Sequence, residues 1–248
     1  MSIQLTLIGI GTGNPEHLTL QAIRAMNAQD LIMVPRKGAG KDDLADLRRE
    51  ICAEVVTNAQ TRIVEFDLPV RDLKIQDYRQ RVDDWHDAIA AVWRDTIAAC
   101  PNATRVALLV WGDPSLYDST LRIAARLSPA PQVTVIPGIT SLQALTAAHA
   151  TVLNEIGAPF IVTTGRRLRD EGWPAGVDTI AVMLDAGSAF EAIDPAGLHI
   201  WWGAYVGMKE QIIIEGPLAE VAGQITETRA RARADHGWIM DIYLLRKA

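Results

Sequence analysis

The feature that most constrains the fold is an alternation of short apolar segments with helical ones through the first 150 residues. The segments IQLTLI (3–8), LIMVP (31–35) and RVALLVW (105–111) are typical of strands buried on both faces. Two further strands are expected at 63–70 and 132–136, and helices at 15–28, 42–57, 74–99 and 139–149. Such alternation predicts an α/β lobe, residues 1–152, whose mainly parallel sheet carries helices on both faces.

The remainder of the chain, residues 153–248, follows a plausible hinge at 151–159 and is richer in strands than in helices. Hairpin connections become possible there, so this part predicts a second α/β lobe with a mixed sheet. Strands are expected at 159–164, 179–184, 198–203, 210–214 and 238–245, and one helix at 217–231.

Charge and cysteine content exclude several classes of partner. The net charge of −6 and the pI of about 5.4 argue against free nucleic acid as a partner. Cys52 and Cys100 stand at no metal-ligand spacing, so neither a zinc site nor a disulfide framework is expected, and a reducing compartment is indicated. The N-terminus lacks the basic region of a signal peptide, and no segment is long enough to span a bilayer. We therefore expect a cytoplasmic protein with no membrane association and no metal.

A glycine turn, GIGTGN (9–14), follows the first strand. A dinucleotide-binding turn needs G-x-G-x-x-G, whereas the third glycine here comes one residue early. The acid expected at the end of the second strand is also missing; Asp30 precedes that strand, and Arg36 and Lys37 follow it. Since Arg36 could bind a 2′-phosphate, an NADP-dependent oxidoreductase stays open, as does a tight turn without a ligand. No Gly-Lys-Ser/Thr follows, which excludes a P-loop.

Two other strand ends carry polar motifs. WGDPSLYDS places Asp113 directly after a buried strand, and VIPGITS places Thr140 and Ser141 at the start of a helix. The carboxyl ends of parallel strands form the edge where open α/β sheets bind ligands. Three motifs at one such edge favour a binding site over three unrelated loops.

These motifs, in this order, resemble those of the tetrapyrrole methylase family, whose members methylate corrin and sirohaem precursors. The family's G-x-G-P-G-D turn corresponds to residues 9–14, its Gly-Asp-Pro to 112–114, its Pro-Gly-Ile/Val-Thr/Ser to 137–141, and a late glycine–leucine pair to 216–218. Thr12 replaces the family's proline and Asn14 its aspartate. With the stretches KGAGKDDLADLRREIC and FDLPVRD, these departures resemble a branch that methylates ring carbon 1 of precorrin-5 and releases acetate in cobalamin synthesis.

The resemblance implies S-adenosylmethionine as co-substrate, held in the cleft between the lobes, and a homodimer. A seam on the helix expected at 74–99, with Trp85 and Val92, is one place for the dimer contact. Carried over by position, the residues that contact S-adenosylmethionine are Thr12, Trp111, Gly112, Asp113, Leu116, Thr140, Ser141, Leu184, Ala204, Val206 and Gly207.

The implied chemistry sets different demands for its two steps. Methyl transfer requires mainly alignment, because the sulfonium carries its own leaving group. Deacetylation also requires a base and an oxyanion donor. Asp113 and Tyr117 are our first candidates for these roles, with His17 and His149 as others. Each also has a purely structural interpretation as a cap or packing residue.

A basic cluster follows the second and third strands. Arg36, Lys37 and Arg71 are our candidates for binding the carboxylates of an acidic tetrapyrrole, and Lys41, Arg48 and Arg49 lie nearby in the sequence. A solvated basic surface is the alternative. Three other functions stay open: methylation of another ring carbon or of RNA ribose, an NADP-dependent oxidoreductase, and a non-catalytic tetrapyrrole carrier. The acidic pI argues against the RNA substrate.

Overall fold

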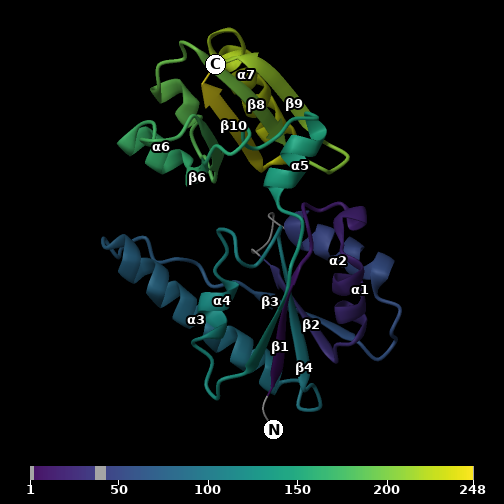
Figure 1. Ribbon diagram of the computed structural model, residues 1–248. Coiled ribbons are helices and arrows are strands. Elements are labelled where there is room, and N and C mark those ends of the chain that lie inside the picture. Colours follow the sequence, from purple (N-terminus) through teal and green to yellow (C-terminus); the bar gives the residue numbers. More distant parts are fainter. Residues whose placement is uncertain (1–2, 37–42, 248) are drawn as a thin grey trace. The chain divides into compact units, whose positions relative to one another are not determined.

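A computed structural model describes residues 3–36 and 43–247, which form two compact units (Figure 1). The first unit is Met1–Thr140 and the second is Ser141–Ala248. The first holds a parallel sheet with helices on both faces, and the second holds a mixed sheet with helices, which confirms the predicted fold class.

The sheet of the first unit has five strands in the order β3-β2-β4-β1-β5, and every neighbouring pair is parallel. Its central strands β1 and β4 are buried from their second residue onward because helices cover both of their faces. The strands are β1 (Gln4–Gly9), β2 (Leu31–Arg36), β3 (Arg62–Asp67), β4 (Arg105–Val110) and β5 (Gln132–Ile136).

Helices cover both faces of this sheet (Figure 1). On one face, α1 (Leu20–Asn27) and α2 (Asp43–Val55) share a core with Ile8 and Leu109. On the other face, α3 (Tyr78–Ala98) and α4 (Thr120–Ala124) share a second core that includes Trp93. Helices thus cover both faces of the sheet, and its carboxyl edge is formed by the loops that follow the strands.

Two helices begin later than the sequence pattern suggested, because side chains cap them. The segment Pro15–His17 is a separate 3₁₀ turn, η1, and the hydroxyl of Thr19 accepts a hydrogen bond from the amide of Ala22 to start α1. The Asp77 carboxylate accepts one from the amide of Gln80, so α3 begins at Tyr78 and not at residue 74. Helix α3 buries His86, Ile89, Ala90, Trp93 and Ile97.

The sheet of the second unit also has five strands, in the order β6-β7-β10-β8-β9. Only β6 and β7 are parallel to each other; the other three pairings are antiparallel. The strands are β6 (Phe160–Thr164), β7 (Thr179–Met183), β8 (Leu198–Ala204), β9 (Ile212–Pro217) and β10 (Asp241–Lys247).

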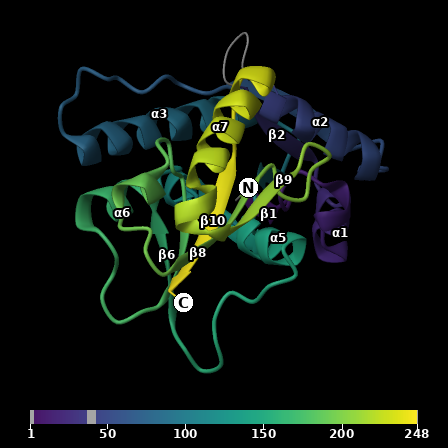
Figure 2. The same ribbon diagram turned by 90° about the horizontal axis from the view of Figure 1, so that it is seen from above.

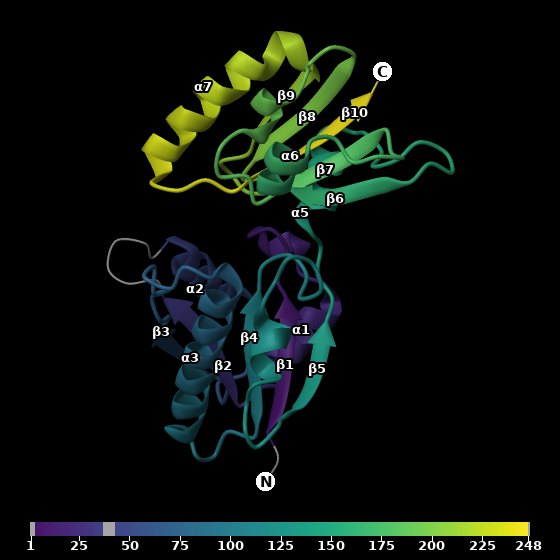
Figure 3. The ribbon, with the colours of Figure 1, turned by 90° about the vertical axis from the view of Figure 1, so that its left-hand side faces the viewer.

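Helices lie on both faces of this second sheet, with α5 (Ser141–Ala148) opposite α7 (Leu218–His236) (Figure 3). Seen from above, α7 crosses over β8 and β10 (Figure 2). The face under α7 also carries α6 (Gly165–Glu171) and the 3₁₀ turn η2 (Ala189–Ala192). Sequence analysis assigned residues 141–152 to the first lobe, but α5 packs on β8 and β10 and so belongs to the second unit.

Candidate functional site

Three loops at the carboxyl edge of the first sheet approach one another closely through their main chains. Gly9 ends β1, Gly112 follows β4 and Gly138 follows β5. A Cβ atom on Gly9 would lie 2.6 Å from the Gly138 nitrogen and 2.7 Å from the Gly112 oxygen, and one on Gly138 would overlap the same oxygen. Only glycine permits this approach at positions 9 and 138, so these two motif glycines have a structural role.

The glycine turn and the loop after β4 are also hydrogen-bonded to each other. The amide of Gly112 donates to the Gly11 carbonyl at 2.7 Å, and the amide of Gly11 donates back at 3.4 Å. Both residues adopt positive φ, +71° at Gly11 and +61° at Gly112. The sequence therefore placed these motifs correctly at one edge, and the structure joins them into one frame.

Asp113 strengthens this frame with both of its carboxylate oxygens. One oxygen accepts the amide of Gly138 at 2.9 Å, and the other accepts the amide and hydroxyl of Ser115. Burial raises the pKa of Asp113, but these hydrogen bonds outweigh it and hold the pKa below the ordinary range of an aspartate. A carboxylate that stays ionised with both oxygens engaged is suited to positioning and poorly suited to taking up a proton.

Thr12 and His17 form a second polar pair at the glycine turn. The Thr12 hydroxyl oxygen lies 2.8 Å from Nδ1 of His17, and only 8% of Thr12 is exposed. The side chain of Asn14 accepts the amide of Glu16 and so starts η1, the 3₁₀ turn that carries His17. Sequence analysis named the two residues separately, but their pairing requires this particular turn.

Trp111, the first residue after β4, is half-buried above the side chain of Arg48. The Arg48 guanidinium carbon is 4.7 Å from the centre of the indole ring, and its Nε donates to the carbonyl of Leu109 at 3.1 Å. Burial lowers the pKa of Arg48 to about 10. Arg48 thus stabilises the end of β4 through its contacts with Trp111 and Leu109. Its place in a basic sequence cluster did not indicate this role.

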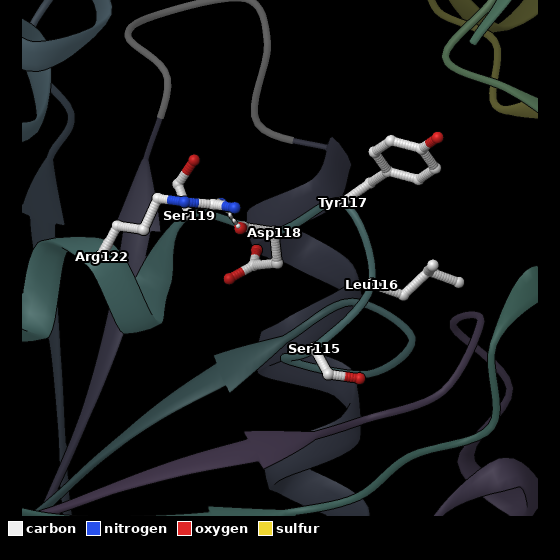
Figure 4. A pocket seen from close by; sticks show the side chains of 6 residues that line it. All are labelled: Ser115, Leu116, Tyr117, Asp118, Ser119 and Arg122. Carbon is white, nitrogen blue, oxygen red and sulfur yellow. Dashed lines mark hydrogen bonds between the residues drawn. The ribbon is translucent and has the colours of Figure 1, made fainter. Parts of the chain in front are cut away.

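An open pocket lies in the loop that leads from β4 to α4 (Figure 4). It is lined by Ser115, Leu116, Tyr117, Asp118, Ser119 and Arg122. Tyr117 has a φ of +49° and is 44% exposed, and its ring points away from Asp118 and Arg122 (Figure 4). A bulky residue held in the left-handed region is strained, and such strain is concentrated at functional sites.

Thr140 lies beside the loop after β4, with its Cα 3.6 Å from the position that a Cβ of Gly112 would take. The next residue, Ser141, is the first residue of α5 and of the second unit. The two residues that sequence analysis treated as one motif therefore belong to different units.

In the second unit, Leu184 directly follows β7. Among the predicted residues of this unit it has the features most typical of a ligand contact. It is 65% exposed and has a φ of +52°, an unusual combination for a large apolar residue. The next residue, Asp185, anchors it: the buried carboxylate accepts hydrogen bonds from the hydroxyl of Tyr243 and the amides of Gly187 and Ala189. Sequence analysis did not single out Asp185 or Tyr243.

The loop after β8 contributes the other predicted positions of this unit. Ala204 and Val206 are buried, so only their main chain could meet a ligand. Between them, Tyr205 has a φ of +51°, and its hydroxyl donates to the carbonyl of Trp238 at 2.6 Å. Gly207 has a φ of +85°, and its amide donates to the side chain of Gln211.

The predicted substrate-binding cations differ in their surroundings. Arg36 is ion-paired with Asp67 at 2.9 Å and with Glu65 at 3.5 Å, and Arg49 also pairs with Glu65. Arg71 stacks on Trp85 at 4.0 Å from the ring centre and has no ion pair among the described residues. Lys37 and Lys41 lie outside the described residues.

His149, another candidate for proton transfer, is engaged within the second unit. Its Nε2 lies 3.0 Å from the carbonyl oxygen of Trp202, and its Nδ1 lies 3.3 Å from the carboxylate of Glu215. The side chain is almost fully buried, which favours the structural interpretation. Within residues 3–36 and 43–247, no three side chains of the metal-binding types come together, and no helix is both long and apolar enough to cross a membrane.

Sequence and structure comparisons agree with this arrangement of motifs. Residues 4–222 match the family described as Tetrapyrrole (Corrin/Porphyrin) Methylases. Precorrin-6A synthase [deacetylating] of Sinorhizobium sp is 50% identical over 98% of this chain and 95% of its own length. A precorrin-2 C(20)-methyltransferase of the same genus is 33% identical over 55% of this chain and 54% of its own.

Two solved structures show the fold in related proteins. A cobalamin synthesis related protein (CobF) from Corynebacterium diphtheriae superposes with a TM-score of 0.84 at 38% identity over 99% of both chains. The uroporphyrin-III C-methyltransferase of Thermus thermophilus, complexed with S-adenosylhomocysteine, has a TM-score of 0.58 at 18% identity over 98% of this chain and 97% of its own. With its motifs, its fold and nearly its whole length in agreement, this chain belongs to the tetrapyrrole (corrin/porphyrin) methylase family.

Proposed function

We propose that this chain is an S-adenosylmethionine-dependent C-methyltransferase of cobalamin biosynthesis. In this proposal it methylates ring carbon 1 of precorrin-5 and releases the acetyl group there as acetate, which gives precorrin-6A. The observation that carries the proposal is the 50% identity, over 98% of the chain, with a precorrin-6A synthase [deacetylating]. The departures at Thr12 and Asn14 support the same branch.

The proposed contacts to S-adenosylmethionine come from the strand-end loops of both units. When bound, this group supplies an activated methyl on a sulfonium. Two of the proposed contacts lie together, since a Cβ on Gly112 would be 3.6 Å from the Cα of Thr140. The exposed, strained Leu184 offers an apolar contact. The proposed set is Thr12, Trp111, Gly112, Asp113, Leu116, Thr140, Ser141, Leu184, Ala204, Val206 and Gly207.

Asp113 and Tyr117 are the proposed catalytic residues, with different tasks. The Asp113 carboxylate, already engaged by Gly138 and Ser115, holds the loops and presents negative charge toward a cationic ligand. The Tyr117 ring is exposed from the pocket loop, so its hydroxyl is the better placed of the two to exchange protons with the substrate.

The proposed substrate is an acidic tetrapyrrole, bound through its carboxylates. Arg71 is the strongest candidate because its guanidinium is preoriented on Trp85 and pairs with no carboxylate of the described chain. Arg36 could bind a substrate carboxylate only after its ion pairs with Asp67 and Glu65 break. Lys37 stays a prediction from the sequence.

We further propose a homodimer, as the family resemblance implies, with the side of α3 that carries Trp85 and Val92 as its contact. Both residues are half-buried. We also propose that the protein acts in the cytoplasm, where its two buried free thiols, Cys52 and Cys100, stay reduced.

The test uses precorrin-5 that carries an isotopic label in its acetyl group, together with S-adenosylmethionine labelled in the transferred methyl. One acetate released per methyl transferred supports the proposal. Coupling is expected because breaking the bond to the acetyl group leaves an electron pair on the ring, and that carbon then accepts the methyl. Methylation with the acetyl group retained would instead indicate a methyltransferase for another ring position.

A further inference from the structure

We propose that Thr12 is the nucleophile that removes the acetyl group, with His17 as its base. The inference rests on the proposed deacetylating function and adds to it a covalent step. Its geometric basis is the 2.8 Å separation between the Thr12 hydroxyl oxygen and His17 Nδ1. A hydroxyl and an imidazole within hydrogen-bond reach of each other form the usual arrangement for activating a weak nucleophile.

The pair is held in place by the turn around it. Gly11, on one side of Thr12, is bridged to Gly112 through two main-chain hydrogen bonds. His17 packs so closely on this turn that a Cβ on Gly11 would lie 2.7 Å from the His17 Cβ. The imidazole therefore faces Thr12 because of two fixed elements, the glycine turn and η1, and not through a long flexible connection.

The position of the pair also matches the reaction. The bridge from Gly11 to Gly112 places the Thr12 turn beside the loop that carries Asp113, at the carboxyl edge where ligands bind in such sheets. Thr12 therefore brings a hydroxyl, already paired with an imidazole, to this edge of the sheet.

The other candidate bases are less suitable for this step. Asp113 has both oxygens engaged by Ser115 and Gly138. His149 is almost fully buried in the second unit against Trp202 and Glu215. Tyr117, which is 44% exposed, is proposed as the proton donor to the developing oxyanion and not as the base.

The proposed step starts from the His17 tautomer with its proton on Nε2, so that Nδ1 accepts the Thr12 proton. The Thr12 oxygen adds to the acetyl carbonyl carbon as that proton moves to Nδ1. The bond between this carbon and ring carbon 1 breaks, its electron pair stays on the ring, and the acetyl group becomes an ester of Thr12. Ring carbon 1 uses that electron pair to bond the methyl of S-adenosylmethionine, the bond from this methyl to sulfur breaks, and S-adenosylhomocysteine is the leaving group. His17 returns its proton to solvent.

A water molecule completes the cycle. His17 accepts a proton from this water, whose oxygen adds to the ester carbonyl, and the bond to Thr12 breaks. Thr12 regains its hydroxyl proton and acetate leaves. In sum, one water is consumed, acetate and protons are released, and the protein is unchanged.

The experiment is a single turnover of the full chain with acetyl-labelled precorrin-5 and S-adenosylmethionine, quenched in acid and followed by peptide mass mapping. We expect the label on the peptide that contains Thr12. Added hydroxylamine should divert part of the product from acetate to acetohydroxamate. Thr12→Ser should keep this behaviour, whereas Thr12→Val should lower acetate release by about 10²-fold or more. Thr96→Val, which removes a hydroxyl bonded only to its own helix, is the matched control.

Two results would overturn the inference. One is coupled methylation and acetate release by the native chain with no labelled Thr12 and no hydroxamate. The other is a Thr12→Val variant that releases acetate at the native rate. Either result leaves the proposed function intact, because acetate and methyl transfer are counted separately. If the native chain methylates and retains the acetyl group, both the proposed function and this inference are wrong.

Discussion

The Asp113 carboxylate accepts a hydrogen bond from the amide of Gly138 at 2.9 Å and so ties the loop after β4 to the loop after β5. These two residues are 25 positions apart in the sequence and come from strands on either side of β1. The bond therefore crosses the carboxyl edge of the sheet, beneath the surface proposed to bind S-adenosylmethionine.

Replacing Asp113 with alanine should destabilise the first unit. The Gly138 amide would lose its charged acceptor, which costs about 1–3 kcal/mol when the amide is left unpaired. Urea unfolding measures this loss, and Asp84→Ala, at an exposed position on α3, is the control. Equal unfolding free energies for the two variants would show that the Asp113 bond contributes nothing.

Gly138→Ala should be destabilising and Gly223→Ala stabilising. A methyl on Gly138 would overlap the Gly112 carbonyl, which forces the main chain apart at a cost of about 1–3 kcal/mol. Gly223 lies inside α7 with open space around it, so alanine there should gain about 0.5–1 kcal/mol. Thermal unfolding of both variants tests these opposite changes in stability. A shift of the unfolding temperature in the same direction for both variants would contradict the account of the glycine contact.

S-adenosylhomocysteine should stabilise the protein. At about 100 times its dissociation constant, a ligand that binds only the folded state adds about 2.7 kcal/mol to the free energy of unfolding. Thermal unfolding in the presence of NADPH provides the contrast, since the glycine turn lacks the dinucleotide pattern. Stabilisation by NADPH and none by S-adenosylhomocysteine would favour an oxidoreductase.

Arg71→Ala should raise the KM for the tetrapyrrole and leave the affinity for S-adenosylhomocysteine unchanged. Loss of a charge-assisted hydrogen bond is worth about 1.5–3 kcal/mol, or about tenfold and more in KM. Arg94→Ala removes an arginine that is exposed on α3 beside Asp95 and is the control. Equal KM values for the two variants would remove Arg71 from the substrate site.

Asp30→Asn should reduce stability at neutral pH and flatten the acid limb of the stability curve. The Arg105 guanidinium, with the amides of Thr104 and Arg105, holds the pKa of Asp30 well below its usual range against the opposing effect of burial. Because the pKa is lower in the folded state, the stabilisation is complete above the ordinary value of about 3.9 and is lost as the pH falls below it. Urea unfolding between about pH 2 and 7 tests the sign, with Asp84→Asn as the control.

Much of the fold follows from the sequence for physical reasons. A strand buried on both faces is mostly apolar, so β1, β2 and β4 were recognisable within a residue or two. Helix α6 was not expected, because it is short and starts at Gly165 directly after a strand; the hydroxyl of Thr164 caps it by accepting the amide of Arg167.

The site was predictable at the level of loops and less so at the level of side chains. The rule that parallel strands end at one edge brought Gly11, Gly112 and Thr140 together correctly. Arg48 looked like a surface cation, and only its stacking on Trp111 and its bond to Leu109 show that it is buried. Such contacts depend on helix orientation, which residue type and spacing leave undetermined.

The contact among Gly9, Gly112 and Gly138 fixes the spacing of the loops, whereas neighbouring side chains can vary. Since these loops touch through main chain, side chains next to them that make no bond between the loops, such as Thr12 and Thr140, do not set the distance between the loops. A lineage can therefore exchange reactive groups at those neighbouring positions while the scaffold keeps its spacing. Divergence of ring position among related enzymes then needs new side chains on an inherited backbone, and no new architecture.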